Sequence, residues 1–185
     1  MTERLIKWAA KRKGLIVRGT AESGAVFTDC EQYRPLLWRV WGDGPLIMWL
    51  LLNPSTADEI ELDNTLSKCR SYTLRWGGYG GMIVCNAFDY RATNPKAMKK
   101  QARPNSEHNS AAICRAAKLA NLIVCGWGND GQHNDQARFI GAWLHHAGVA
   151  DKLAALRVTK RGQPGHPLYL PGRLTPRSFY LPGHV

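Results

Sequence analysis

The chain has 185 residues, of which 44% are hydrophobic and 21% are charged. This composition suits one compact domain with a buried core, and it excludes the fibrous and disordered classes of protein. Lysine and arginine number 25 against 14 acidic residues, and the net charge of +11 favours a polyanionic partner, nucleic acid first.

The first third of the chain predicts one helix and several short strands. Residues 2–13 are typical of an amphipathic helix that ends at Gly14. Three short strands, which look antiparallel, are predicted at residues 15–18, 25–28 and 36–41. A turn at residues 42–45 then leads into residues 46–52, whose unbroken apolar character indicates a central strand buried on both faces.

Helices and strands alternate over the rest of the chain. Helices are predicted at residues 63–76, from residue 95 onward, and at residues 105–119 and 134–146. Strands are predicted at residues 82–86, 122–125 and 153–159. Such alternation implies crossover connections and a mainly parallel sheet with helices on both faces.

We therefore predict an α/β fold that forms a single domain over residues 1–185. The expected architecture is a three-layer α/β/α sandwich with a central, mainly parallel four-stranded sheet and a small N-terminal antiparallel extension. Residues 1–45 would hold the N-terminal helix and short strands, residues 46–170 the core with its functional segments, and residues 171–185 a tail.

The cysteines and the apolar runs exclude several classes of protein. The five cysteines are odd in number and widely spread, which speaks against a disulfide framework, a structural zinc site and an iron–sulfur cluster. No signal-peptide pattern opens the chain, and the run Leu46–Leu52 is too short to cross a bilayer. We expect a cytoplasmic protein that binds no metal, no cofactor and no membrane.

Four polar segments directly follow predicted strands, and they are Asn53–Asp58, Asn86–Thr93, Gly126–Asp130 and Gly165–Leu170. Ligands of open α/β sheets bind beyond the carboxyl ends of the strands, so one shared pocket is expected there. Each segment alone has an ordinary explanation, because Asn-Pro is a common turn and a lone histidine is usually structural. Their order along the chain carries the specificity.

In this order the segments resemble the uracil-DNA-glycosylase-like superfamily. A strand ending in Asn53-Pro54 is similar to the motif whose asparagine positions the attacking water. The strand that ends at Asn86 resembles the element whose asparagine reads the base edge. The loop with His166-Pro167-Leu168 is similar to the motif whose histidine stabilises the departing base and whose next residues wedge into the duplex. The likeness runs from about Leu46 to Leu170, and the chain also looks like a bacterial and phage family.

The resemblance implies a monofunctional, metal-independent DNA glycosylase. It would hydrolyse the N-glycosidic bond of a damaged or modified base, expected to be a pyrimidine, that has been flipped out of single- or double-stranded DNA, and it would leave an abasic site. A monomer is expected. DNA repair and defence against phages with modified DNA would both follow from this chemistry.

The chemistry assigns roles to particular residues. The expected catalytic residues are Asn53, His166 and Asp58: the amide orients a water, the imidazole donates to the leaving base, and the carboxylate is an auxiliary base. The expected base-binding residues are Asn86, Pro54 and Ser55, because an amide offers both a donor and an acceptor. The expected DNA contacts are Arg91, Lys160, Arg161 and Arg173, with Leu168 and Tyr169 as the wedge.

Departures from the superfamily's motifs favour a base other than plain uracil. Asn-Pro is followed by Ser-Thr-Ala-Asp instead of Gly, and residues 62–66 contain no aromatic side chain that could stack on a base. Asp63 is interpreted as a helix cap and Trp127 as a packing residue. Two alternatives stay open: a non-catalytic nucleic-acid-binding module of the same fold, and an enzyme that acts on free nucleosides or nucleotides.

Overall fold

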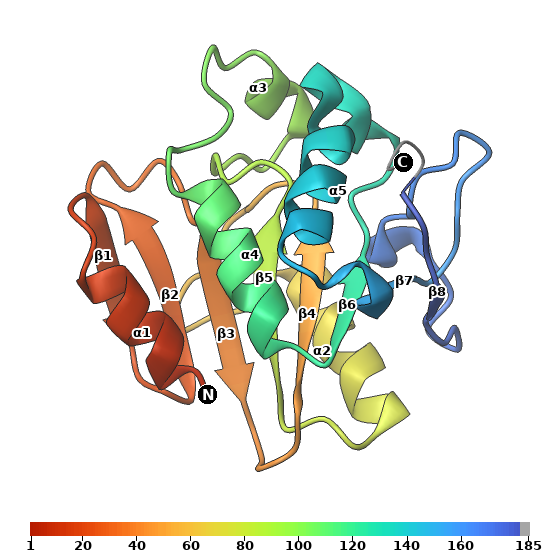
Figure 1. The fold of residues 1–185 in the computed structure, drawn as a ribbon, viewed down its shortest axis with the longest axis horizontal. Coiled ribbons are helices and arrows are strands. Elements are labelled where there is room, and N and C mark those ends of the chain that lie inside the picture. The colour runs from red at the N-terminus through yellow and green to blue at the C-terminus, as the bar shows by residue number, and fades with distance from the viewer. Residues whose placement is uncertain (182–185) are drawn as a thin grey trace.

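A computed structural model describes residues 1–181, so the last four residues of the predicted tail lie outside the described residues. One mixed sheet of eight strands carries helices on both faces (Figure 1). The strand order across the sheet is β1-β2-β3-β5-β4-β6-β7-β8. The predicted α/β class is confirmed, but the sheet has more strands than the predicted four.

The elements have the following bounds. The strands are β1 (Leu15–Gly19), β2 (Ser23–Thr28), β3 (Leu36–Val40), β4 (Leu46–Leu51), β5 (Gly81–Asn86), β6 (Leu122–Cys125), β7 (Leu153–Ala155) and β8 (Arg177–Ser178). The helices are α1 (Glu3–Ala10), α2 (Asn64–Trp76), α3 (Pro95–Lys99), α4 (Asn109–Leu119) and α5 (Gln136–His146). Short 3₁₀ segments are η1 (Asn129–Asp135), η2 (Ala150–Lys152) and η3 (Pro167–Tyr169).

The N-terminal strands are antiparallel, as predicted, and they belong to the main sheet. β1 pairs with β2, and β2 pairs with β3. β3 then pairs antiparallel with β5, where Trp38 lies opposite Ile83. The N-terminal strands therefore extend one edge of the sheet instead of forming a separate flap.

The middle of the sheet is parallel and sets the position of the candidate site. β4 lies between β5 and β6 and runs parallel to both, and β7 runs parallel to β6. In this register Leu51 lies opposite Asn86, and Leu50 lies opposite Cys125. The carboxyl ends of these strands consequently meet at one edge of the sheet.

The apolar run 46–52 is buried on both faces, as predicted, because alternate residues of β4 enter two cores. Met48 and Leu50 pack in the core that includes residues of α1, α4 and α5. Trp49 enters the other core, where its ring stacks on Trp76 of α2 at 5.6 Å and its Nε1 donates to Thr73 Oγ1 at 3.1 Å. Helix α2 thus covers the face behind the view of Figure 1.

Several element boundaries differ from the predicted ones. The strand predicted at 153–159 ends at Ala155, because the chain folds back into a loop in which Val158 bridges Pro164. The last long helix begins at Gln136, since Asn134 has a φ of 52° and interrupts the preceding 3₁₀ segment. The first helix ends at Ala10, short of residue 13, and β8 was not predicted at all.

Two remaining predictions concern membranes and cysteines. Over residues 1–181 no helix is both long and apolar enough to cross a bilayer. Cys69, Cys85 and Cys125 are free and buried, whereas Cys30 is free and exposed.

Candidate functional site

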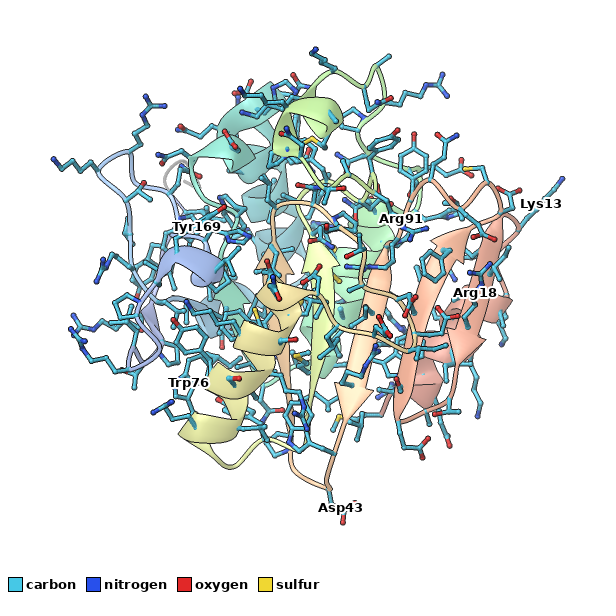
Figure 2. All side chains as sticks on the ribbon, turned by 180° about the vertical axis from the view of Figure 1, so that it is seen from behind. Lys13, Arg18, Asp43, Trp76, Arg91 and Tyr169 are labelled. Carbon is cyan, nitrogen blue, oxygen red and sulfur yellow. The ribbon has the colours of Figure 1, made fainter. Side chains whose placement is uncertain are left out.

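A pocket of about 850 Å³ opens at the carboxyl edge of the parallel strands. Its walls come from the segments after β4, β5, β6 and β7 and from the first residues of α2. Of the candidates proposed from sequence, the structure brings Asn53, Ser55, His166, Leu168 and Tyr169 into this one lining. Figure 2 views this side of the molecule and labels Tyr169 on the loop after β7.

The side chain of Asn53 is fixed by two backbone carbonyl groups. Its Nδ2 donates to Ala92 O at 2.6 Å and to Pro54 O at 3.0 Å. The amide oxygen has no donor among the described residues, so an acceptor is left for a ligand or a water. An aspartate at this position could not donate to either carbonyl group, which explains why an amide can hold the loop here and a carboxylate cannot.

Asp63 caps α2, as predicted, and it also lines the pocket. Its Oδ1 accepts a hydrogen bond from Leu66 N at 2.9 Å, in the usual geometry of an N-cap. One carboxylate oxygen therefore holds the helix, while the other has no hydrogen-bond donor among residues 1–181. The helix dipole places positive potential at this end of α2, which stabilises the carboxylate there.

A buried arginine lies behind this wall of the pocket. Arg34 is only 2% exposed, and its guanidinium Nη1 donates to Ala57 O, which fixes the loop after Asn53-Pro54. Burial lowers the pKa of Arg34 to about 10, while the charge of Asp63 acts in the opposite direction. Arg34 and Asp63 therefore attract each other across the base of the first loop. No sequence pattern marks Arg34 as a site residue, because a single arginine before a strand is expected to be exposed.

The loop that carries His166 comes close to the turn after β6. A Cβ at Gly126 would lie 2.9 Å from Pro167 Cδ, so only a glycine allows this approach. Gly128 has a φ of 67°, and its N–H donates to Pro164 O at 2.8 Å. The two loops are thus joined, and the histidine is carried to the mouth of the pocket.

Desolvation by burial lowers the pKa of His166, while the carboxylate of Asp63 raises it by a smaller amount. The imidazole is therefore neutral at neutral pH. Its Nδ1 is buried and has no hydrogen-bond partner among the described residues, which leaves Nε2 as the nitrogen that a ligand can reach. No described residue holds Nδ1, so no hydrogen bond within residues 1–181 fixes the tautomer of the imidazole.

The wedge candidates Leu168 and Tyr169 lie in one short 3₁₀ turn, and side chains of α2 bind the backbone carbonyl groups of this region. Lys68 Nζ donates to Leu168 O at 2.8 Å, and the hydroxyl of Tyr72 donates to Leu170 O at 3.0 Å. The side chain of Tyr169 is 82% exposed at the rim of the pocket, with its ring 5.6 Å from that of His166. It is the exposed aromatic side chain of the lining and supplies a stacking surface that the sequence motif lacks.

Asn86 and Asp58, two of the predicted site residues, do not line the pocket. Asn86 is only 2% exposed, and its Nδ2 has no hydrogen-bond partner among the described residues. Asp58 Oδ1 accepts from the backbone N–H groups of Ile60 and Glu61, both at 2.8 Å, and these bonds lower its pKa. Its carboxylate thus holds a turn beyond the pocket wall.

Arg91 likewise points elsewhere. Its Nη1 donates to Glu31 O at 3.1 Å, and its guanidinium carbon lies 5.1 Å from the centre of the Phe27 ring. Figure 2 shows Arg91 toward the N-terminal strands, away from Tyr169. Arg91 buttresses the N-terminal strands, and the buried Pro54 accepts from Ala92 N at 2.8 Å without lining the pocket.

Two of the predicted DNA-binding cations lie in a loop that adjoins the lining of the pocket. Lys160 and Arg161 are exposed in the loop between Val158 and Pro164, next in sequence to the lining residue Thr159. Arg173 borders a second hollow beside β7 and β8. On the opposite rim, Lys99 of α3 pairs with Asp130, and Asp130 itself lines the pocket.

The arrangement combines an acceptor amide, a carboxylate and a neutral imidazole in one pocket. Its volume falls within the range of about 300–1,000 Å³ that is usual for small-molecule sites. A carboxylate can take a proton from water, and an imidazole N–H can donate to an atom that gains negative charge. Such a set is suited to the hydrolysis of a bond whose leaving group departs as an anion.

The chain belongs to a family of proteins of unknown function, DUF1643, whose family model matches residues 34–168, well over half of the 185 residues. The matched span contains Arg34, Asn53, Asp63 and His166. No curated protein and no solved structure matches the chain. The likeness to the uracil-DNA-glycosylase-like superfamily therefore stays a prediction.

Proposed function

We propose that the protein is a DNA glycosylase that hydrolyses the N-glycosidic bond of a modified base held in the pocket between the strand ends. The observation that carries the proposal is the shared lining of one pocket by Asn53, Asp63 and His166. The net charge of +11 supports a polyanionic substrate. A base must leave the stack to enter such a pocket, at a cost of a few kcal/mol.

Asn53 and Asp63 together would prepare the attacking water. The amide oxygen of Asn53 accepts a hydrogen bond from the water, and the carboxylate of Asp63 takes its proton as the water attacks C1′ of the sugar. The bond from C1′ to the base nitrogen breaks, and its electron pair leaves with the base. General-base assistance of this kind is worth about 10²–10⁴ in rate. Asp63 takes the role that the sequence assigned to Asp58, because Asp63 lines the pocket and Asp58 does not.

His166 would stabilise the departing base. As a neutral imidazole it donates a hydrogen bond from Nε2 to the base atom that gains negative charge, and it needs no proton of its own to be lost or gained beforehand. With Nε2 as the donor, Nδ1 is an acceptor without a partner among the described residues. Asn64 and Asn129, two further amides of the pocket lining, are better placed than the buried Asn86 to read a base edge.

The wedge and the finer assignment of the fold belong to the same proposal. Leu168 and the exposed Tyr169 would fill the space that a flipped base leaves, and Tyr169 can stack on an exposed base.

We assign the fold to the three-layer α/β/α sandwiches, centred on the parallel strands β5, β4, β6 and β7. The protein would act in the cytoplasm as a monomer, in DNA repair or in defence against phages.

The test is direct assay of base release. Single- and double-stranded oligonucleotides that carry uracil, 5-hydroxymethylcytosine or its glucosylated form would be incubated with the protein and scored for alkali-labile sites. We expect such sites on at least one modified strand, and a loss of about 10²–10³ in rate in His166→Ala. His146→Ala, which changes an exposed histidine at the end of α5, is the matched control and should retain the full rate.

Two outcomes would replace the proposal. If the protein binds the oligonucleotides but releases no base from any of them, the non-catalytic binding module is correct. If it cleaves free nucleosides or nucleotides and binds DNA with negligible dependence on salt, the pocket serves small substrates, because phosphate contacts impose a steep salt dependence.

A further inference from the structure

A second hollow of about 580 Å³ lies beside β7 and β8 and carries three arginine side chains. Arg157 follows β7, Arg177 lies in β8, and Arg173 belongs to the segment that leads to β8. The register places Arg177 opposite Ala155, two residues before Arg157. The pairing of these two strands therefore places Arg157 and Arg177 on neighbouring segments that line the same hollow.

The three guanidinium groups have no partner among the described residues. None of them forms a hydrogen bond or ion pair with another residue of the described range 1–181, and no aspartate or glutamate lines the hollow. All three arginines are exposed, and three like charges around one hollow repel one another. Such an arrangement is stabilised when an anion enters it. A guanidinium group presents a fork of donors that matches two oxygen atoms of a phosphate.

The hollow adjoins the base-sized pocket along the chain. Val158 lines the hollow and Thr159 lines the pocket, and on the other side Leu174 lines the hollow while Leu170 lines the pocket. The exposed Lys160 and Arg161 follow directly after Thr159. The segments involved are the loops around β7 and β8 in Figure 1. A strand with one base in the pocket can therefore continue over this hollow.

We propose that Arg157, Arg173 and Arg177 form a binding site for consecutive phosphate groups of a nucleic-acid strand. This inference rests on the proposed function, because it takes the strand that supplies the base as the ligand. Arg173 and Arg177 lie outside the span that matches the family model. The site anchors the backbone and takes no part in breaking the glycosidic bond.

The test compares two variants that each remove three positive charges. One is the triple variant Arg157→Ala, Arg173→Ala, Arg177→Ala. The control changes exposed cations on α1, α2 and α4 and is Arg4→Ala, Arg75→Ala, Lys118→Ala. Binding of a fluorescent single-stranded oligonucleotide would be followed by anisotropy over a range of salt concentrations, after circular dichroism has shown that each variant is folded.

We expect the triple-arginine variant to bind about 10–100-fold more weakly, with the slope of log Kd against log salt reduced by about two, since each phosphate contact on a single strand contributes about 0.7. The control should lose less than about threefold at the same salt. A third variant, with lysine at all three arginine positions, keeps the charge and loses the fork, and it should fall between the two. Equal losses in the triple-arginine variant and the control would overturn the inference.

Two further measurements distinguish this phosphate site from a site for a free anion and from the proposed glycosylase activity. Inorganic pyrophosphate at equal ionic strength should compete only weakly, and displacement of the oligonucleotide at micromolar pyrophosphate would show that the hollow binds a free anion instead. Weaker binding in the triple-arginine variant alone would support the phosphate site even if the parent protein releases no base. Base release with unchanged oligonucleotide binding in that variant would support the glycosylase and reject the phosphate site.

Discussion

The ends of β4 and β5 are adjacent and paired, yet the polar side chains at these two strand ends have opposite environments. After β4, the amide of Asn53 and the carboxylate of Asp63 line an open pocket. After β5, Asn86 is 2% exposed and Asp89 is fully buried. A polar residue at a strand end is therefore not enough to define a site. What covers the segment decides whether its polar groups meet a ligand or the core.

The cover over the second segment comes from α4 and α5. Asn109 Nδ2 donates to Asn86 O and Ala87 O, both at 3.2 Å, and Gln136 Nε2 donates to Ala87 O at 2.6 Å. Ser106 donates through its backbone N–H to Asp89 Oδ1 at 2.7 Å and through its hydroxyl to the other carboxylate oxygen. These bonds satisfy the backbone of a segment that water cannot reach.

The largest expected effect is that of His166→Ala, which tests whether the residues that line the pocket act on the substrate. We expect base release to fall by about 10²–10³, because one donor to the leaving group is lost, with oligonucleotide affinity changed less than about twofold. Single-turnover rates and anisotropy on the same substrate would measure the two quantities. Parallel loss of rate and affinity would mean that the histidine binds DNA and does not act on the bond.

Asp63→Asn isolates the charge of the carboxylate from its structural role. Asparagine is as good an N-cap as aspartate, so thermal stability should hold while base release falls by about 10². Asp58→Asn is the comparison, and it should retain most of the rate because that carboxylate holds a turn outside the pocket. A larger fall in the rate of base release in Asp58→Asn than in Asp63→Asn would instead support Asp58 as the general base, as expected from the sequence.

Asp89→Asn tests the buried segment after β5 by its effect on the free energy of unfolding. Burial raises the pKa of Asp89 from an ordinary 3.8 to about 6, although its bonds to Ser106 oppose the shift. A folded pKa above the unfolded value favours folding below the unfolded pKa, and this contribution is lost as pH rises through about 6. We expect the unfolding free energy of the parent, relative to Asp89→Asn, to fall by about 3 kcal/mol between about pH 4 and about pH 8.

Denaturant unfolding of both proteins at several pH values would measure this difference. A difference that does not vary with pH would mean that Asp89 titrates normally and that the segment after β5 is more open to water than its burial indicates. Base release per folded molecule should not change, since Asp89 does not line the pocket.

The smallest expected effect is that of Asn86→Ala on activity. Because the side chain is buried and away from the pocket lining, base release should stay within about threefold of the parent rate. Steady-state kinetics on the best substrate would show this. A loss of tenfold or more would break the comparison, because it would place Asn86 against the base as the sequence resemblance implied.

Some of the fold and the site could be predicted because local chemistry determines them. The apolar run at 46–52 gave the central strand, the carboxylate of Asp63 gave the start of α2, and Asn94-Pro95 gave the start of α3. The pocket at the carboxyl edge follows from parallel pairing, which places Asn53 and the loop with His166 at the same edge.

Other features depend on contacts between distant residues, which a single sequence does not show. Arg34 reaches the carbonyl group of Ala57 across the sheet edge, and nothing local marks it as buried. Asn86 and Asn53 look alike in sequence, and only the packing of α4 and α5 separates them. The two-residue strand β8 exists because Ala155 pairs with Arg177, a contact that no periodicity predicts.

Helix α2 links parts of the molecule that the proposed reaction keeps separate. Its first turn is held by Asp63, and farther along it Lys68 and Tyr72 bind the carbonyl groups of the loop that carries Leu168 and Tyr169. A rigid element therefore fixes the spacing between the carboxylate and the exposed ring. If a bound nucleic-acid strand shifts the loop, α2 would shift with it and move the carboxylate of Asp63. Binding of the substrate and positioning of the general base would then occur together.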